Sequence, residues 1–228
     1  MKRRESKSLI FGALFILAFI LWTVLIQTVD VKPIGVNGTE IGFAAVNSWF
    51  HKMTGVNFTL YHITDWLGLV PVAVCAVFGI IGLIQWITRK SLLKVDFDII
   101  ILGVYYVIII LGYIIFEMYP INYRPVLINA FLEASYPSST TLLVLGVMPT
   151  AVFEAQKRLK NIKIKRLITI IVMIFSVFMV TGRLLSGVHW FTDIIGSVLL
   201  CVGLFCIYKA VVNLRVNGVE KWNLDKNF

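Results

Sequence analysis

The chain has 228 residues, of which 59% are hydrophobic and 14% are charged, and its mean hydropathy is +0.89. This composition excludes a soluble domain with a polar surface and is typical of an integral membrane protein. The formal net charge of +9 resembles that of a nucleic-acid-binding protein. A membrane protein can instead carry such an excess in the loops that face the inner leaflet, so no nucleic-acid partner is expected.

Six stretches are predicted to cross the bilayer as helices, because each supplies the roughly 20 mostly apolar residues that a crossing needs. They lie near residues 9–28, 66–88, 98–117, 138–155, 167–184 and 191–212. The first is predicted to be an anchor and not a signal peptide, since it is long and no small-residue cleavage site follows it. We therefore expect one all-α domain over residues 1–228, a bundle of six transmembrane helices.

The basic residues predict the orientation of these helices. Lysine and arginine mark cytoplasmic loops, and all but four of the 21 basic residues fall at the N-terminus, after the second span, after the fourth span or near the C-terminus. The exceptions are Lys32, Lys52, Arg124 and Arg183. The pattern predicts a multi-pass protein of the cell membrane with both termini in the cytoplasm.

The predicted outer face gathers most of the chemically interesting side chains. It comprises segment 29–65 and the loops 118–137 and 185–190. It holds or borders all three histidines, two arginines and three acids, namely His51, His62, His189, Arg124, Arg183, Glu117, Glu133 and Asp193. We expect an active site at this face, while His51 and His62 are expected to serve packing or to lie in loops.

Segment 41–53 of this face has apolar residues at helical spacing. Val46, Trp49, Phe50 and Met53 predict an amphipathic helix. Two arrangements fit the pattern equally well, either a helix lying on the outer leaflet beside a lipid entrance or a lid packed over the bundle.

The loop before the fourth span ends in the hydroxyl-rich run Tyr136-Pro137-Ser138-Ser139-Thr140-Thr141. Serine and threonine are common helix N-caps, so capping alone would explain them. Free backbone N–H groups at a helix N-terminus also bind anions. Arg124 lies in the same loop, and two arginines can hold a phosphate through forked hydrogen bonds. These neighbours favour an anion site.

The strongest signal is the segment 182–193, where Arg183, His189 and Asp193 lie between two apolar stretches. Ionisable groups at a membrane boundary are costly and are usually functional. A guanidinium suits an anionic substrate, an imidazole can act as nucleophile or base, and a carboxylate can orient it.

These residues resemble the motifs of the type-2 phosphatidic acid phosphatase superfamily of membrane lipid phosphatases. Its third motif reads Ser-Arg, five residues, His, three residues, Asp, and Arg183, His189 and Asp193 match it, with Gly182 in place of Ser. Its second motif, Pro-Ser-Gly-His, matches at Pro137 and Ser138, while Ser139 replaces Gly and Thr140 replaces His. Its first motif, Lys, six residues, Arg-Pro, matches at Arg124 and Pro125, with Glu117 at the Lys position.

The resemblance implies a role for each matched residue. His189 would attack phosphorus and form a phosphohistidine, while Asp193 would hold the ring and stabilise its charge. The phosphoryl oxygens would be bound by the side chains of Arg124, Arg183, Ser138 and Ser139 together with backbone N–H groups. No metal and no cofactor are implied. The substrate would be a lipid phosphate in the membrane, and the oligomeric state is left open.

The departures from the motifs bear on the choice of substrate. The family's second-motif His would protonate the leaving alkoxide, which Thr140 cannot do. A lipid pyrophosphate, whose leaving group is a phosphate monoester, needs less help from an acid. Glu117, Glu133 and His62 are alternative proton donors by their side of the membrane. Glu117 would weaken the binding of a doubly charged monoester or favour a substrate that carries an amine.

Three functions are therefore weighed from the sequence. The first is hydrolysis of a lipid phosphate or pyrophosphate at the outer leaflet. The second is a lipid phosphotransferase of the same fold. The third is a non-catalytic lipid-binding or transport descendant, which the changes at Glu117 and Thr140 favour and the retained His189 and Asp193 oppose. The three cysteines, Cys75, Cys201 and Cys206, all fall within predicted spans, so no disulfide is expected.

Overall fold

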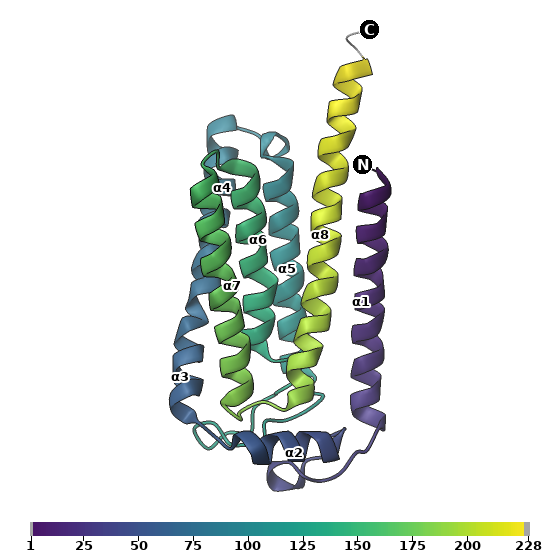
Figure 1. Ribbon diagram of the computed structural model, residues 1–228, viewed down its shortest axis with the longest axis vertical. Coiled ribbons are helices and arrows are strands. Elements are labelled where there is room, and N and C mark those ends of the chain that lie inside the picture. Colours follow the sequence, from purple (N-terminus) through teal and green to yellow (C-terminus); the bar gives the residue numbers. More distant parts are fainter. Residues whose placement is uncertain (1, 226–228) are drawn as a thin grey trace.

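The computed structural model describes the backbone of residues 2–225 and the side chains of residues 4–215. The described chain is built almost entirely from α-helices (Figure 1). In chain order the helices are α1 (Lys2–Thr28), α2 (Ala44–Thr54), α3 (Phe58–Leu67), α4 (Leu69–Arg89), α5 (Phe97–Met118), α6 (Ser139–Arg158), α7 (Ile162–Leu185) and α8 (Phe191–Asp225). The prediction of an all-α bundle is confirmed.

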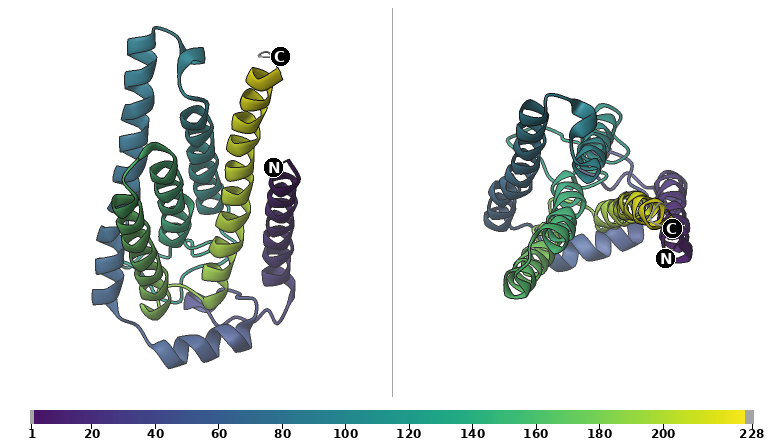
Figure 2. Two further views of the ribbon diagram at one scale, coloured as in Figure 1. Left: turned by 45° about the horizontal axis from the view of Figure 1, so that its top comes forward. Right: turned by 90° about the horizontal axis from the view of Figure 1, so that it is seen from above.

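The bundle is organised around α6, which contacts α4, α5, α7 and α8. The first helix, α1, packs along α8 at the side of the bundle (Figures 1 and 2). One apolar core joins α5, α6 and α8 through Leu102, Tyr105, Leu142, Val147 and Tyr208. The outward faces of α4 and α7 expose large aliphatic side chains, as expected for helices that meet lipid.

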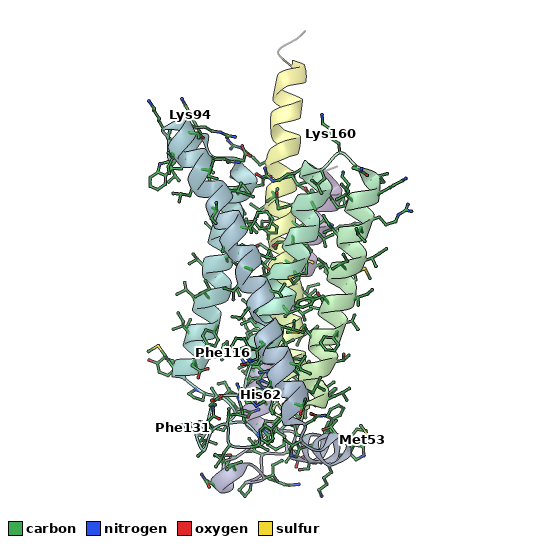
Figure 3. All side chains as sticks on the ribbon, turned by 90° about the vertical axis from the view of Figure 1, so that its left-hand side faces the viewer. Met53, His62, Lys94, Phe116, Phe131 and Lys160 are labelled. Carbon is green, nitrogen blue, oxygen red and sulfur yellow. The ribbon has the colours of Figure 1, made fainter. Side chains whose placement is uncertain are left out.

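Both described ends of the chain lie at one end of the bundle, which we call the terminal end (Figure 1). Lys94 and Lys160, from two predicted inner loops, lie at this end too, whereas Met53, His62 and Phe131 lie at the opposite end (Figure 3). We call that opposite end the α2 end, because α2 crosses it (Figures 1 and 2). The structure thus separates the basic loops from the predicted outer residues.

Five helical segments are long and apolar enough to cross a membrane: Arg4–Thr28, Phe58–Arg89, Phe97–Met118, Ile162–Leu185 and Phe191–Arg215. They correspond to five of the six predicted spans. The remaining prediction, at 138–155, coincides with α6, which is a helix of suitable length but is not among the five. Its central position explains the low hydropathy, because a helix covered by other helices need not present an apolar surface to lipid.

The polar side chains of α6 are paired with neighbouring helices. Tyr106 and Thr150 share a hydrogen bond of 2.7 Å. Tyr208 of α8 donates to the buried Glu154 at 2.8 Å, and Arg158 of α6 itself donates to the same carboxylate at 2.8 Å. Buried polar groups that are paired in this way cost little to retain inside a bundle.

The second predicted span begins eight residues earlier than expected, at Phe58. The sequence predicts residues 58–65 as part of the outer segment, whereas in the structure they form most of α3. Gly68 separates α3 from α4. Asn57 caps the start of α3 by accepting a hydrogen bond from the backbone N–H of Leu60 at 2.9 Å. This helix brings Tyr61 and Asp65 to the candidate site.

Helix α2 packs over the bundle, as one of the two predicted arrangements requires, while its place relative to the outer leaflet stays a prediction. On one face, Asn47 donates to Thr192 at 3.1 Å and Phe50 stacks on Phe191, so α2 packs across the start of α8. On the other face, Val46, Trp49 and Met53 are exposed. The helix is therefore a lid over this end of the bundle that also presents an apolar stripe.

Candidate active site

The candidate site is assembled at the α2 end from two stretches that are far apart in the sequence, residues 124–138 and residues 183–193. Arg183 comes from the last turn of α7, His189 from the α7–α8 loop and Asp193 from the first turn of α8. Arg124 lies in the loop between α5 and α6, which leads into Ser138 at the start of α6. All five residues are at least nine-tenths buried.

A tight turn after α7 brings His189 back over Arg183. Ser186 donates from its backbone N–H to Gly182 at 2.8 Å and from its hydroxyl to the carbonyl of Arg183 at 2.7 Å. Gly187 then adopts φ +68°, where a Cβ would lie 1.8 Å from the carbonyl oxygen of Gly55. Only glycine fits this turn, which places the imidazole against the guanidinium.

Both ring nitrogens of His189 have polar neighbours. Its Nδ1 lies 3.1 Å from the carbonyl oxygen of Ser135, to which it can donate. Its Nε2 lies 3.2 Å from Nη2 of Arg183, which donates to it. Burial, followed by the positive charges of Arg124 and Arg183, lowers the pKa of His189 well below its usual value. A neutral ring keeps the Nε2 lone pair available for attack.

Asp193 reaches the imidazole indirectly, which differs from the expected arrangement. Its Oδ2 lies 3.9 Å from Nδ1 of His189, too far for a hydrogen bond. The hydroxyl of Ser135 stands between them, donating to Asp193 at 2.5 Å and lying 3.1 Å from Nδ1. Asn122 at 3.2 Å and the backbone N–H of Trp190 at 2.9 Å also donate to Asp193. The sequence reading missed Ser135 and Asn122.

Both arginines lie close to the same aromatic ring, that of Tyr61. The guanidinium carbon of Arg183 lies 4.8 Å from the ring centroid of Tyr61, and that of Arg124 lies 5.7 Å from it. Such cation–π contacts stabilise two neighbouring positive charges. Arg124 also forms a 3.1 Å ion pair with Glu133, and Arg183 lies 3.6 Å from Asp65.

Several buried donors of these arginines have no hydrogen-bond partner within the described chain. They are Nη1 of Arg124 and both Nε and Nη1 of Arg183. Buried donors are normally satisfied, and a guanidinium fits an oxyanion with two parallel bonds. The donors therefore suit a phosphate or a similar oxyanion placed beside Nε2 of His189.

The start of α6 supplies further anion-binding groups. Ser138 precedes the helix but makes no side-chain cap, because its hydroxyl donates to Thr141 at 3.0 Å. The first backbone N–H groups of α6 are thus not used by a capping hydroxyl. This favours the prediction that the hydroxyl-rich run belongs to an anion site over the alternative that it only caps the helix. Ser138 is fully buried, Ser139 is half-buried and Thr140 is 8% exposed.

A cavity of about 290 Å³ opens beside these residues, between α3, α4, α5 and α6. Its polar lining consists of Asp65, Tyr113, Ser139 and Thr140, and the rest is formed mainly by aliphatic side chains. Glu117 is exposed and lines a separate, much smaller cavity with Tyr136, Pro137 and Ser139. Thr140 and Glu117, which the second and first motifs predict as site residues, therefore line different cavities, and Ser139 lines both.

The other two histidines and the three cysteines lie outside the group formed by His189, Asp193 and the two arginines. His62 is exposed on α3, while His51 packs its ring 5.6 Å from that of Trp190. All three cysteines are free, with Cys75 on α4 and Cys201 and Cys206 on α8. The described residues contain no group of three His, Cys, Asp or Glu side chains that could hold a metal ion. This absence does not test whether the reaction uses a metal, and metal independence stays a prediction.

Comparison with known proteins identifies the family of this chain. The sequence matches the model of the PAP2 superfamily over residues 99–216, which include Arg124, the start of α6 and the whole of the Arg183–Asp193 segment. The search of curated proteins gave no match. The fold is similar to that of the first transmembrane PAP2-type phosphatidylglycerolphosphate phosphatase from Bacillus subtilis, with a TM-score of 0.59, 19% identity and coverage of 87% of this chain and 93% of that one.

Proposed function

Because the chain belongs to the PAP2 superfamily, we propose that it is a membrane phosphatase which hydrolyses a lipid phosphate or pyrophosphate through a phosphohistidine on His189. One observation carries the proposal: the buried His189 presents Nε2 3.2 Å from an arginine that has further unpartnered donors. A nucleophile and an oxyanion site are thus adjacent, as phosphoryl transfer requires.

The first chemical step follows from this arrangement. A terminal phosphoryl group bound by Arg124, Arg183 and the start of α6 places its phosphorus against Nε2 of His189. The N–P bond forms while the bond from phosphorus to the leaving oxygen breaks. The ring then becomes positive, and the carbonyl of Ser135 and the carboxylate of Asp193, acting through the Ser135 hydroxyl, stabilise that charge.

The cavity beside Thr140 supports entry of the substrate from the side of the bundle. Aliphatic residues of α4 and α5 line it next to the hydroxyls of α6. An acyl or isoprenoid chain could remain among these apolar side chains while its phosphate reaches the arginines. The scheme uses no metal or cofactor, since the two guanidinium groups supply the positive charge that opposes the phosphoryl oxygens.

We propose further that α6 is a sixth crossing, so that the chain forms one domain with six spans and both termini in the cytoplasm. A pair of exposed lysines tests the orientation, namely Lys52 on α2 and Lys160 in the α6–α7 loop. Each is changed to cysteine in a background whose native cysteines are replaced by alanine. An impermeant thiol reagent applied to intact cells should label Lys52→Cys and should label Lys160→Cys only after the membrane is opened. The opposite labelling would reverse the orientation and put the site at the inner leaflet.

The leaving-group preference gives a second test. Since Thr140 cannot donate a proton near neutral pH, the purified protein should release phosphate from farnesyl pyrophosphate faster than from farnesyl monophosphate or phosphatidic acid. Thr140→His should raise the monoester rates by about tenfold or more, because an imidazole in the cavity can protonate the leaving oxygen. Adding Glu117→Lys should strengthen monoester binding further.

The same panel of substrates separates the alternative functions. A phosphotransferase would move labelled phosphate to a second lipid and release little inorganic phosphate. A non-catalytic descendant would be inert on every substrate. Efficient monoester cleavage by the wild type, unchanged in Thr140→His, would contradict the leaving-group argument.

A further inference from the structure

We infer that Asp65 is the general base of the second step, accepting a proton from the water that hydrolyses the phosphohistidine. This inference rests on the proposed function. Asp65 lies in the last turn of α3, just before the break at Gly68. Its Oδ1 is 3.6 Å from Nη1 of Arg183, whose Nη2 is 3.2 Å from Nε2 of His189. A single guanidinium therefore separates the carboxylate from the nucleophile.

Asp65 is also open to the cavity from which water and substrate would come. Its side chain is 55% exposed, and it lines the cavity together with Ser139 and Thr140. Among the residues that line this cavity, Asp65 carries the only carboxylate. By the motif resemblance, Thr140 holds the position of the family's second-motif His. The cavity therefore has the carboxylate of Asp65 in its lining and no imidazole at that position.

The other acids near the site are engaged or lie elsewhere. Asp193 is fully buried and accepts hydrogen bonds from Ser135, Asn122 and the backbone of Trp190. Glu133 pairs with Arg124 at 3.1 Å. Glu117 lines the smaller cavity. Asp65 is thus the carboxylate best placed to reach a water beside a phosphoryl group held by Arg183.

The hydrolytic step balances with this assignment. The water oxygen attacks phosphorus, the P–N bond breaks, and its electron pair returns to Nε2 of His189. The water proton passes to the carboxylate of Asp65 and leaves through the cavity to solvent. Inorganic phosphate departs, and the neutral imidazole is restored. General-base catalysis of this kind typically contributes about 100-fold to 10,000-fold.

This role also agrees with the absence of an acid at Thr140. A carboxylate that acts as a base in the second step need not be protonated in the first. The first step then depends on a leaving group that departs without a proton, as a phosphate monoester does. The site is accordingly suited to lipid pyrophosphates, and the preference expected from Thr140 and the base assigned to Asp65 support each other.

Rapid-quench kinetics with farnesyl pyrophosphate labelled with ³²P in its terminal phosphate test the inference. The wild type, Asp65→Asn, and the matched control Glu40→Gln, an exposed acid of segment 29–65, are compared. Asp65→Asn should release about one equivalent of farnesyl monophosphate per protein in a burst, with a steady rate about 100-fold lower than wild type. Labelled phosphohistidine should accumulate in this variant. Thr140→His added to Asp65→Asn should restore much of the steady rate, since an imidazole in the same cavity can accept the proton.

The possible outcomes have distinct meanings. If Asp65 only balances the charge of Arg183, Asp65→Asn should lower KM without a burst or accumulated phosphoenzyme, and the inference is overturned. In a variant that unfolds at the wild-type temperature, a fall in rate without accumulation, unrelieved by Thr140→His, would also overturn it, because the defect would precede phosphoenzyme formation. Absence of turnover in the wild type would remove the proposed function itself and this inference with it.

Discussion

His189→Ala is expected to abolish turnover of every lipid phosphate, with a fall in kcat on the order of 10⁴-fold or more. The site contains no second imidazole that could take over, because His62 is exposed on α3 and His51 packs against Trp190. An alanine at this position also leaves the arginine donors in place, so substrate can still bind. The measurement is phosphate release from farnesyl pyrophosphate by purified protein.

The matched control is His62→Ala, which removes an exposed imidazole on the same end of the bundle and should leave kcat within about twofold of wild type. Both variants should elute from a size-exclusion column at the same volume as the wild type, and their unfolding temperatures should be similar to that of the wild type. Retention of substantial activity by His189→Ala would mean that another group attacks phosphorus and that the mechanism is wrong.

Arg183→Lys is expected to lower kcat/KM by about 100-fold to 1000-fold, the usual cost of losing one transition-state donor. Arg183 contacts the ring of Tyr61, donates to His189 and retains two unpartnered N–H donors. A lysine keeps the charge but has one compact ammonium group, so it cannot make these contacts together. Inhibition by vanadate should weaken in parallel.

Arg166→Lys is the matched control, because it makes the same change at an exposed position of the same helix. It should leave both kcat/KM and vanadate inhibition unchanged. Wild-type kinetics in Arg183→Lys would place the bound anion elsewhere. Arg124→Lys should show a smaller loss, since Arg124 is already partly occupied by Glu133 and by the carbonyl of Ala134.

Much of the fold could be predicted because bilayer crossing imposes length and hydropathy on a helix. The predicted spans coincide with α1, α4, α5, α6, α7 and the first part of α8, with ends displaced by several residues. The start of α3 is not predicted from hydropathy, because the features that mark it are local. Asn57 is a capping residue, and two exposed residues separate the buried Tyr61 and Thr64. α6 shows the opposite case, a helix whose polar residues are explained only by its central place.

The third motif indicates the candidate site because its residues are close in sequence and unusual at a membrane boundary. Ser135, Asn122 and Asp65 were missed since each contributes through tertiary packing, without a spacing that marks it. Asp65 falls at the boundary between the predicted outer segment 29–65 and the span predicted at 66–88, where a polar residue is unremarkable. At Gly182, where the motif resemblance would have Ser, a Cβ would lie 2.7 Å from the methyl group of Thr64. The start of α3 could have been predicted from Asn57, because asparagine is a preferred N-cap residue.

The central claim is that His189 becomes phosphorylated during turnover. The direct measurement is to quench the purified wild type within its first turnovers of ³²P-labelled farnesyl pyrophosphate, digest it at alkaline pH and locate the label. The account predicts an acid-labile label on the peptide that contains His189, formed fast enough to account for kcat and absent from His189→Ala. Turnover with no covalent label, or with label on another residue, would contradict it.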